Sequence, residues 1–445
     1  MNYLKKFKEI KNIQISNGIL KTSRKKIIVV FILFFLPAKL LFAQVINGVD
    51  YSSRSEVDHT FDMAGEDNFG YRFASENYTY KDEVTGVTVN ALTTSRHKSS
   101  KIYQTHPQWT SDGKYIVFLS NRTKNEDGPK RQYYAVSTEN FEIVQITTGE
   151  GVDNLHVGWK DNMAFYFKGK DLIEFNLGKL LKDSETRTVG NVTDYEKVLY
   201  TIPEDLDPSG VGLDASQESL FFSNKKDDSH YEIYNIDFKN KKITKTLDIP
   251  YRIGHLQANP YKSGELMYCW ETGGDAPQRI WYVTIDKNGK ATNKALYNEK
   301  DNDWVTHEVF MGPDRVLFHL MGHIDRLNDH QTGIYSIKTD NTDLQFHGQT
   351  DGGGYWHCNA TPDAKWIAGD TFDGKLYRIN ANNPKDVVLL TQGHRSGSRS
   401  PFSNEPHLHQ SVSPDGKWIL FNSSFLTEND IMLVPMFPDN LKKTK

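Results

Sequence analysis

The chain has 445 residues, of which 25% are charged, 37% belong to the apolar set and 12% are aromatic. This balance excludes a disordered chain and a multi-span membrane protein, and the 22 Tyr and 24 Phe favour β structure. The formal net charge is −4, but residues 1–43 carry nine basic residues against one acid, which leaves 44 bases against 56 acids in the rest. A region this acidic is a poor candidate for binding nucleic acid through bulk electrostatics.

Residues 1–43 have the pattern of a secretory signal. Arg24-Lys25-Lys26 precedes ten apolar residues, 27 to 36, and a Leu41-Phe42-Ala43 junction follows them. Ten apolar residues are too few to cross a bilayer as a helix, but they suit the apolar core of a signal peptide. We therefore expect an exported, periplasmic protein cleaved after Ala43. The alternative is that the segment stays uncleaved as a membrane anchor. If it is cleaved, we expect no stable membrane partner.

A short pattern recurs along the rest of the chain, in which a polar turn is followed at once by an apolar strand. It is clearest at 111–118 and at 413–421, where Asp-Gly or Pro-Asp-Gly stands in the turn. Such residues preset φ and then permit a positive φ, so they reverse the chain between two strands. Weaker copies give seven turns in all, near positions 112, 161, 216, 263, 314, 363 and 415.

The spacing of about 50 residues between these turns is typical of four-stranded propeller blades. Seven such units close into a ring and leave no long open sheet edge. We therefore predict an all-β fold, a single seven-bladed β-propeller over residues 51–435. The two cysteines, Cys269 and Cys358, show no metal-binding spacing, and we favour two buried thiols over one disulfide.

Several histidines stand at equivalent places in different repeats, roughly five to eight residues before a turn. They are His106, His255, His307, His357, His407 and His409. Because equivalent positions of successive blades converge on the axis of a propeller, we expect these side chains to meet in the central funnel.

The pair His407 and His409 is the strongest local element. On an extended segment residues i and i+2 point to the same side, so both imidazoles can bind one ion. A third histidine, His307, and the amide oxygen of Asn404 would complete a mixed nitrogen and oxygen site. The alternative is that these histidines only line the funnel or form hydrogen bonds in the core.

The chain resembles the oligogalacturonate lyases, polysaccharide lyase family 22, which are seven-bladed propellers that cleave short pectic oligosaccharides. The similar stretches occur in the family's order and spacing across most of the chain. They are 80–87, Gly254-His255-Leu256-Gln257, 306–310, Ala368-Gly369-Asp370 and 407–415.

The resemblance implies a manganese site formed by His307, His407 and His409, with Asn404 where the family has a Gln. It also implies that His255 is the catalytic base. The family's carboxylate-binding Arg falls near position 230, where this chain has no Arg. The missing Arg affects the prediction of the substrate sugar more than the prediction of the reaction type.

The chemistry implied is β-elimination on a uronic acid. Removal of the C5 hydrogen places a second negative charge beside the carboxylate, so the reaction needs a divalent ion and a base. Arg252, three residues before His255, is our candidate for the missing cation, with Lys225 and Lys226 as alternatives. Surface exposure is the alternative for all three, and we favour it for the two Lys, which stand in a charged loop beside Asp227 and Asp228.

Three further histidines are candidate substrate-binding residues: His97 in a basic cluster, His106 and His357. An exposed basic loop would explain the first equally well, and His357 could instead support the metal or pack in the core. We therefore expect a lyase that acts on anionic uronate oligosaccharides of the oligogalacturonate type. Two alternatives stay open. One is a lyase for another uronic-acid glycan such as ulvan, and the other is a non-catalytic propeller that binds partners without a metal.

Overall fold

The computed structural model describes residues 45–46, 49–50, 68–125, 128–351, 354–395 and 406–439. The chain divides into two compact units, residues 1–63 and 64–445. The first contributes one antiparallel pair, β1 (Val45–Ile46) with β2 (Val49–Asp50). The predicted signal and its cleavage site lie outside the described residues. Within the described ranges, no helix is long and apolar enough to cross a membrane.

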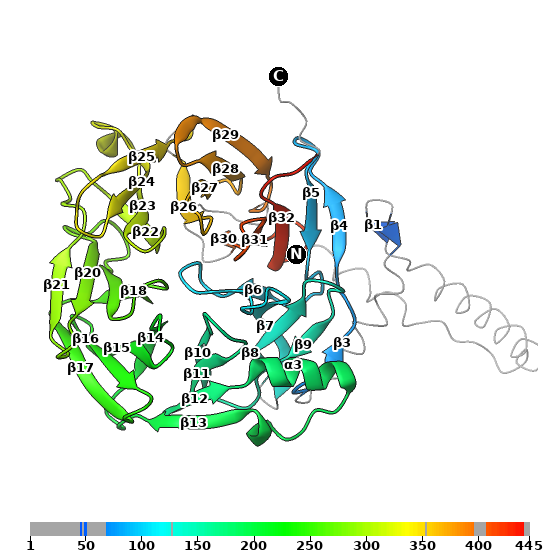
Figure 1. Ribbon diagram of the computed structural model, residues 1–445. Helices are drawn as coiled ribbons and strands as arrows, with labels where there is room; N and C mark the ends of the chain where they lie inside the picture. The colour runs from blue at the N-terminus through cyan, green and yellow to red at the C-terminus, as the bar shows by residue number, and fades with distance from the viewer. Residues whose placement is uncertain are drawn as a thin grey trace, which may run out of the picture. The chain divides into compact units, whose positions relative to one another are not determined.

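The second unit is a seven-bladed β-propeller, as predicted. Seven antiparallel sheets surround a common centre (Figure 1). Blade 1 contains β6 (Ser99–Lys101), β7 (Tyr115–Asn125), β8 (Gly128–Ser137), β9 (Ile143–Gln145) and β3 (Arg72–Phe73). Blade 2 contains β10 (Val152–Val157), β11 (Ala164–Lys168), β12 (Asp171–Phe175) and β13 (Glu196–Thr201). Blade 3 contains β14 (Pro208–Leu213), β15 (Ser219–Asp227), β16 (His230–Asp237) and β17 (Lys242–Ile249).

The remaining blades follow the same order, with the first strand innermost (Figure 1). Blade 4 contains β18 (Ile253–Ala258), β19 (Glu265–Trp270), β20 (Ile280–Ile285) and β21 (Ala291–Ala295). Blade 5 contains β22 (Val305–Phe310), β23 (Arg315–Leu320), β24 (Gly333–Lys338) and β25 (Gln345–Gly348). Blade 6 contains β26 (Tyr355–Ala360), β27 (Trp366–Thr371), β28 (Leu376–Asn380) and β29 (Asn383–Thr391).

Blade 7 closes the ring with strands from both ends of the unit. It combines β30 (Ser411–Val412), β31 (Trp418–Ser423) and β32 (Asp430–Pro435) with the early strands β5 (Thr88–Ala91) and β4 (Tyr78–Lys81). Met432 pairs with Ala91 and Leu433 with Asn90. Because the last blade is completed by an early strand, neither end of the sheet ring is left as a long open edge.

The predicted turns connect the first two strands of each blade. In the blade 1 turn, the Thr110 hydroxyl donates to Asp112 (2.7 Å) and Gly113 adopts a φ of +73°. The blade 7 turn repeats this arrangement, with Ser413 donating to Asp415 (2.6 Å) and Gly416 at +71°. The hydroxyl–carboxylate bond fixes the turn, and glycine meets the positive φ without a Cβ clash.

One helix interrupts the strands and was not predicted. Helix α3 (Leu177–Thr186) follows β12, and the Asn176 side chain caps it by accepting from Lys179 N (3.0 Å). Its buried face, Leu177, Leu180 and Leu181, packs into the core of blades 1 and 2. Two short 3₁₀ turns, η1 (Val192–Asp194) and η2 (Asp325–Leu327), complete the regular structure of the described residues.

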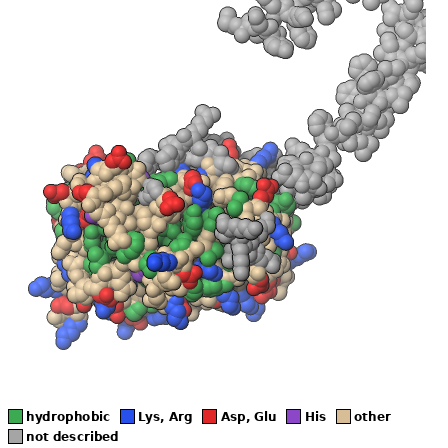
Figure 2. Space-filling model, turned by 90° about the horizontal axis from the view of Figure 1, so that it is seen from above, with side chains coloured by type: hydrophobic (Ala, Val, Ile, Leu, Met, Phe, Trp, Pro, Cys, Tyr) green, Lys and Arg blue, Asp and Glu red, His purple; other side chains and the backbone are tan. Residues whose placement is uncertain are grey.

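Large aromatic side chains fill the space between neighbouring blades. Phe118, Phe222, Phe318 and Phe421 occupy equivalent places on the second strands of four blades, and all are fully buried. Phe222 of blade 3 shows such a contact, because its ring packs on that of Phe167 in blade 2 (ring centroids 5.7 Å apart). On the face drawn in Figure 2, acidic and basic side chains are interspersed with apolar ones. That face therefore has no broad cationic surface.

A segment between β6 and the first turn, residues 102–108, crosses the centre of the ring and is called here the central segment. Gln104 Nε2 donates to the Cys358 carbonyl of blade 6 (3.4 Å). The ring of His106 hydrogen-bonds through Nε2 to the Val211 carbonyl of blade 3 (2.8 Å). The segment is thus fixed to blades on opposite sides and forms one wall of the space that the inner strands enclose.

Candidate metal and base site

The inner strands are bulged at the places where the predicted site residues stand. The pairing of β18 with β19 shifts register between Gly254 and Gln257, and that of β22 with β23 between Thr306 and Val309. At these bulges His255 and His307 have φ values of +50° and +55°, and His409 has +44° just before β30. A bulge re-aims a side chain, so this strain directs imidazoles from several blades to one place.

Four histidines, His307, His357, His407 and His409, form a cluster at this place, called here the histidine cluster. The ligand nitrogens of His357, His407 and His409 lie within 4.8 Å of one another. The ring of His307 adjoins that of His357, with centroids 4.1 Å apart. Of the predicted metal ligands, His407 and His409 thus lie with His357, which was predicted to bind substrate. His307 lies outside this group of three and adjoins it through the His357 ring.

The hydrogen bonds of the cluster leave nitrogen lone pairs available. Nδ1 of His357 lies 2.8 Å from Oδ2 of Asp370, and its Nε2 is buried without a hydrogen bond. Nδ1 of His307 donates to the Trp356 carbonyl (2.6 Å), since a carbonyl can only accept. The Nε2 lone pairs of both rings are thus free to bind an ion, and carboxylate-bound histidine is a common metal ligand.

Burial keeps three of these imidazoles neutral. It lowers the pKa of His307, His357 and His409 well below the usual range, and the other histidines lower it further. Neutral imidazole is the form that binds a transition metal. The donor set, with an orphaned buried nitrogen at His357, therefore fits a divalent ion such as Mn²⁺. Asn404, the predicted fourth ligand, lies outside the described residues.

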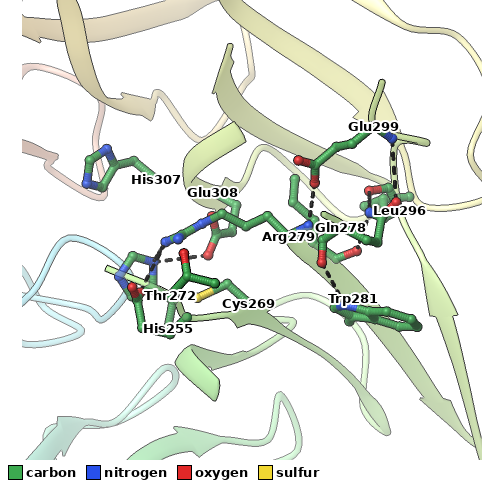
Figure 3. Close-up of polar contacts among 12 residues, drawn as sticks. His255, Cys269, Thr272, Gln278, Arg279, Trp281, Leu296, Glu299, His307 and Glu308 are labelled. Carbon is green, nitrogen blue, oxygen red and sulfur yellow. Dashed lines mark hydrogen bonds and ion pairs between the residues drawn. The ribbon is translucent and has the colours of Figure 1, made fainter. Parts of the chain in front are cut away.

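His255 stands beside the cluster and is held by a buried ion pair (Figure 3). Its ring centroid lies 6.1 Å from that of His307. Its Nδ1 lies 3.0 Å from Oε1 of Glu308, whose Oε2 lies 3.3 Å from Nε of Arg279. A carboxylate can only accept, so the proton of His255 is on Nδ1 and Nε2 carries the lone pair of a base, which accepts a hydrogen bond from the Tyr103 hydroxyl (3.3 Å).

Glu308 is a charged anchor rather than a titrating group. Burial raises its pKa, but the charges of Arg279 and His255 outweigh burial and lower the pKa to about 2. The thiol of Cys269 lies in the same group of potential ligands, yet burial raises its pKa well above the usual range. We therefore interpret this group as the support of a base and not as a second metal site.

The other predicted residues lie elsewhere. Arg252 is exposed, and the guanidinium near His255 is that of Arg279, with 3.4 Å between Nη2 and Nδ1.

His97 is buried directly before β6. Both ring nitrogens of His106 are engaged, by Val211 O and by Thr105 Oγ1 (both 2.8 Å), so it supports the central segment. Both cysteines are free and buried, as favoured from the sequence.

Four residues of the site were missed in the sequence. Glu308 and Asp370 lie inside stretches that resemble the lyase family, and that position was the only available signal. Tyr103 and Arg279 carried none, because their neighbours in the fold are 152 and 24 residues away from them along the chain.

Two solved structures have the same fold as this chain. One solved structure, an oligogalacturonate lyase in complex with manganese, is 20% identical, with a TM-score of 0.68 over 84% of this chain and 99% of its own. An oligogalacturonate lyase from Vibrio parahaemolyticus is 18% identical, with a TM-score of 0.68 over 84% of this chain and all of its own. The fold is that of the oligogalacturonate lyases. No protein-family model and no curated protein matches the sequence. At such identities the oligogalacturonate lyase likeness extends to the fold alone.

Proposed function

We propose that the protein is a polysaccharide lyase that cleaves uronate-containing oligosaccharides by metal-assisted β-elimination. The observation that supports this most is the placement of a neutral imidazole cluster beside a carboxylate-oriented histidine. The first group suits a divalent ion and the second suits a base. A carbon acid next to a carboxylate needs both.

The histidine cluster would hold the ion, most simply Mn²⁺ as in the manganese-bound neighbour. When bound, the ion supplies a Lewis acid for the sugar carboxylate. His255 takes the C5 proton on Nε2, while Glu308, itself anchored by Arg279, fixes its ring and stabilises the imidazolium that forms. Loss of the C4 oxygen then gives an unsaturated sugar.

Two classes of sugar fit the proposed reaction. The neighbours are named for oligogalacturonates, the pectic substrate. However, the buried cation of this site, Arg279, is already paired with Glu308 and Glu271 (3.3 and 3.4 Å) and is not available for a substrate carboxylate. This favours keeping a second substrate class, another 4-linked uronic-acid glycan such as ulvan.

The proposal is tested by incubating the purified protein with oligogalacturonides and with glucuronate-containing oligosaccharides. A C4–C5 double bond absorbs in the ultraviolet, so cleavage appears as rising absorbance. Chelation should abolish the signal, and manganese should restore it better than magnesium. If no uronate is cleaved with any ion, the chain is instead the non-catalytic binding propeller.

The secretory pattern of residues 1–43 adds a proposal on location, since the substrate is extracellular material. We propose export to the periplasm. N-terminal sequencing of the protein recovered from the producing cell tests it, and a start at Gln44 is expected.

A further inference from the structure

Tyr103 is placed at the candidate site by the central segment. The residues around it are fixed to other blades, because Asn359 donates to the Gln104 carbonyl (3.2 Å) and His106 bonds to the Val211 carbonyl (2.8 Å). The backbone of Tyr103 is therefore held at the centre of the ring, away from the strands of its own blade. The Tyr103 side chain has no role in metal binding or in proton removal by His255.

The Tyr103 side chain lies between the base and the histidine cluster. Its hydroxyl is 3.3 Å from Nε2 of His255, the nitrogen that takes the proton. Its ring centroid is 5.0 Å from that of His255 and 4.7 Å from that of His409. A substrate that bridges the cluster and the base would meet this hydroxyl.

The short distance between the Tyr103 hydroxyl and Nε2 of His255 also determines the stereochemistry of an elimination that uses both groups. A sugar ring cannot fit between two atoms 3.3 Å apart, so Tyr103 and His255 must approach it from one face. In the same way, the separation of catalytic groups decides the stereochemical outcome in glycoside hydrolysis. Elimination with acid and base on one face is syn.

We propose, resting on the lyase function above, that Tyr103 is the catalytic acid of a syn elimination. His255 Nε2 takes the C5 proton, and the electrons of the C5–H bond form the C4–C5 double bond. The C4–O4 bond breaks, and O4 leaves with its electron pair and takes the Tyr103 proton. The phenolate then recovers a proton from the His255 imidazolium across the same contact, so both residues return to their starting state.

This mechanism selects the configuration of the substrate. In 4-linked glucuronate the C5 hydrogen and the C4 oxygen lie on the same face of the ring, whereas in galacturonate they lie on opposite faces. The inference therefore assigns glucuronate-configured oligosaccharides as the substrate class. Within the oligogalacturonate lyase fold, this chain would then act on a different sugar.

The experiment compares wild type with Tyr103→Phe on three substrates: a 4-linked glucuronate oligosaccharide, an oligogalacturonide, and a glucuronate with 4-nitrophenoxide at C4. Wild type should cleave the glucuronate oligosaccharide faster than the oligogalacturonide. Tyr103→Phe should lose about 10²- to 10⁴-fold in kcat on that oligosaccharide, but less than about tenfold on the nitrophenyl ether, whose leaving group needs no proton.

A second measurement separates acid from base. In D₂O, Tyr103→Phe should still exchange the C5 hydrogen of the substrate, read by NMR, whereas His255→Ala should not. The matched control is Tyr234→Phe, which removes a hydroxyl bound to Glu232 (3.0 Å) in blade 3 and should keep wild-type turnover. Melting temperatures confirm that each variant is folded.

The outcomes are distinguishable. Equal losses on both glucuronate substrates, or a preference for galacturonate, would overturn the acid role of Tyr103 and leave the lyase function standing. Failure of wild type on every uronate would instead reject the lyase function itself.

Discussion

Nδ1 of His357 lies 2.8 Å from Oδ2 of Asp370, and neither side chain is exposed to solvent. Asp370 also accepts from the backbone N–H of His357 (2.6 Å), so it fixes both the ring and the strand that bears it. A buried carboxyl group with this geometry orients an imidazole toward a metal. The pair explains why His357, a candidate substrate-binding residue in the sequence, belongs to the histidine cluster.

The first prediction concerns this pair. Asp370→Asn should weaken Mn²⁺ binding by about 10- to 100-fold, because the His357 ring loses its orientation, and His357→Ala should weaken it more. Calorimetric titration of the metal-free protein measures both. His347→Ala, which changes a buried histidine of blade 5 bound to Ser336, is the control and should bind manganese normally. Unchanged affinity in His357→Ala would remove this residue from the metal site.

The second prediction concerns the orientation of the base. Glu308→Gln should lower kcat by about 10²-fold or more, because an amide does not hold the Nδ1 proton of His255 as a carboxylate does. It should also destabilise the fold by about 3 kcal/mol, since among the described residues Glu271 would be the one remaining ion-pair partner of Arg279. Steady-state kinetics and denaturant unfolding measure the two effects. A stable variant with normal kcat would contradict the role of Glu308.

The third prediction concerns the central segment. His106→Ala should lower the free energy of unfolding by about 1–3 kcal/mol, because the buried Val211 carbonyl loses its hydrogen-bond partner. Urea unfolding followed by tryptophan fluorescence measures it. If stability is unchanged and the affinity for substrate falls instead, His106 binds substrate, as first expected from its position in the repeat.

The fourth prediction is a pH dependence of stability at the blade 7 closure. Burial raises the pKa of Asp430, which accepts from Thr93 and Thr427, to about 7. The folded chain therefore keeps a proton that the unfolded chain releases near pH 4, so this contribution to stability is full below that pH and is lost as pH rises toward 7.

Asp430→Asn should remove this dependence. The wild type should lose about 2–4 kcal/mol between pH 4 and 8 through this group, and the variant should show a correspondingly smaller decline. Unfolding free energies across that pH range measure the difference. Parallel curves for the two proteins would show that Asp430 is ionised in the folded state.

The sequence was sufficient for the architecture of the propeller because its turns are local. Ser413, Asp415 and Gly416 form one turn through contacts within four residues, and such patterns repeat at a fixed spacing. Helix α3 was missed because its apolar face is short and stabilised by packing on blades 1 and 2. Closure by β5 was missed because the pairing of Met432 with Ala91 spans most of the chain.

Only those residues of the candidate site that stand at repeated positions could be predicted from the sequence. His307, His407 and His409 stand at corresponding places in their blades. The rings of His407 and His409 are neighbours, and the ring of His307 adjoins that of His357. The partners that give each imidazole its role come from contacts without periodicity. Arg279 reaches His255 from the neighbouring strand region of the same blade, and Tyr103 reaches it from blade 1 across the centre. No pattern in the sequence encodes those distances.

The most direct test of the central claim is the mass of the products released from a uronate oligosaccharide by the manganese-loaded protein. Elimination adds no water, so the fragment masses should sum to the mass of the substrate, and one fragment should be unsaturated. Fragments that together exceed the substrate by one water would show hydrolysis, and they would contradict a site in which His255 removes a proton from carbon.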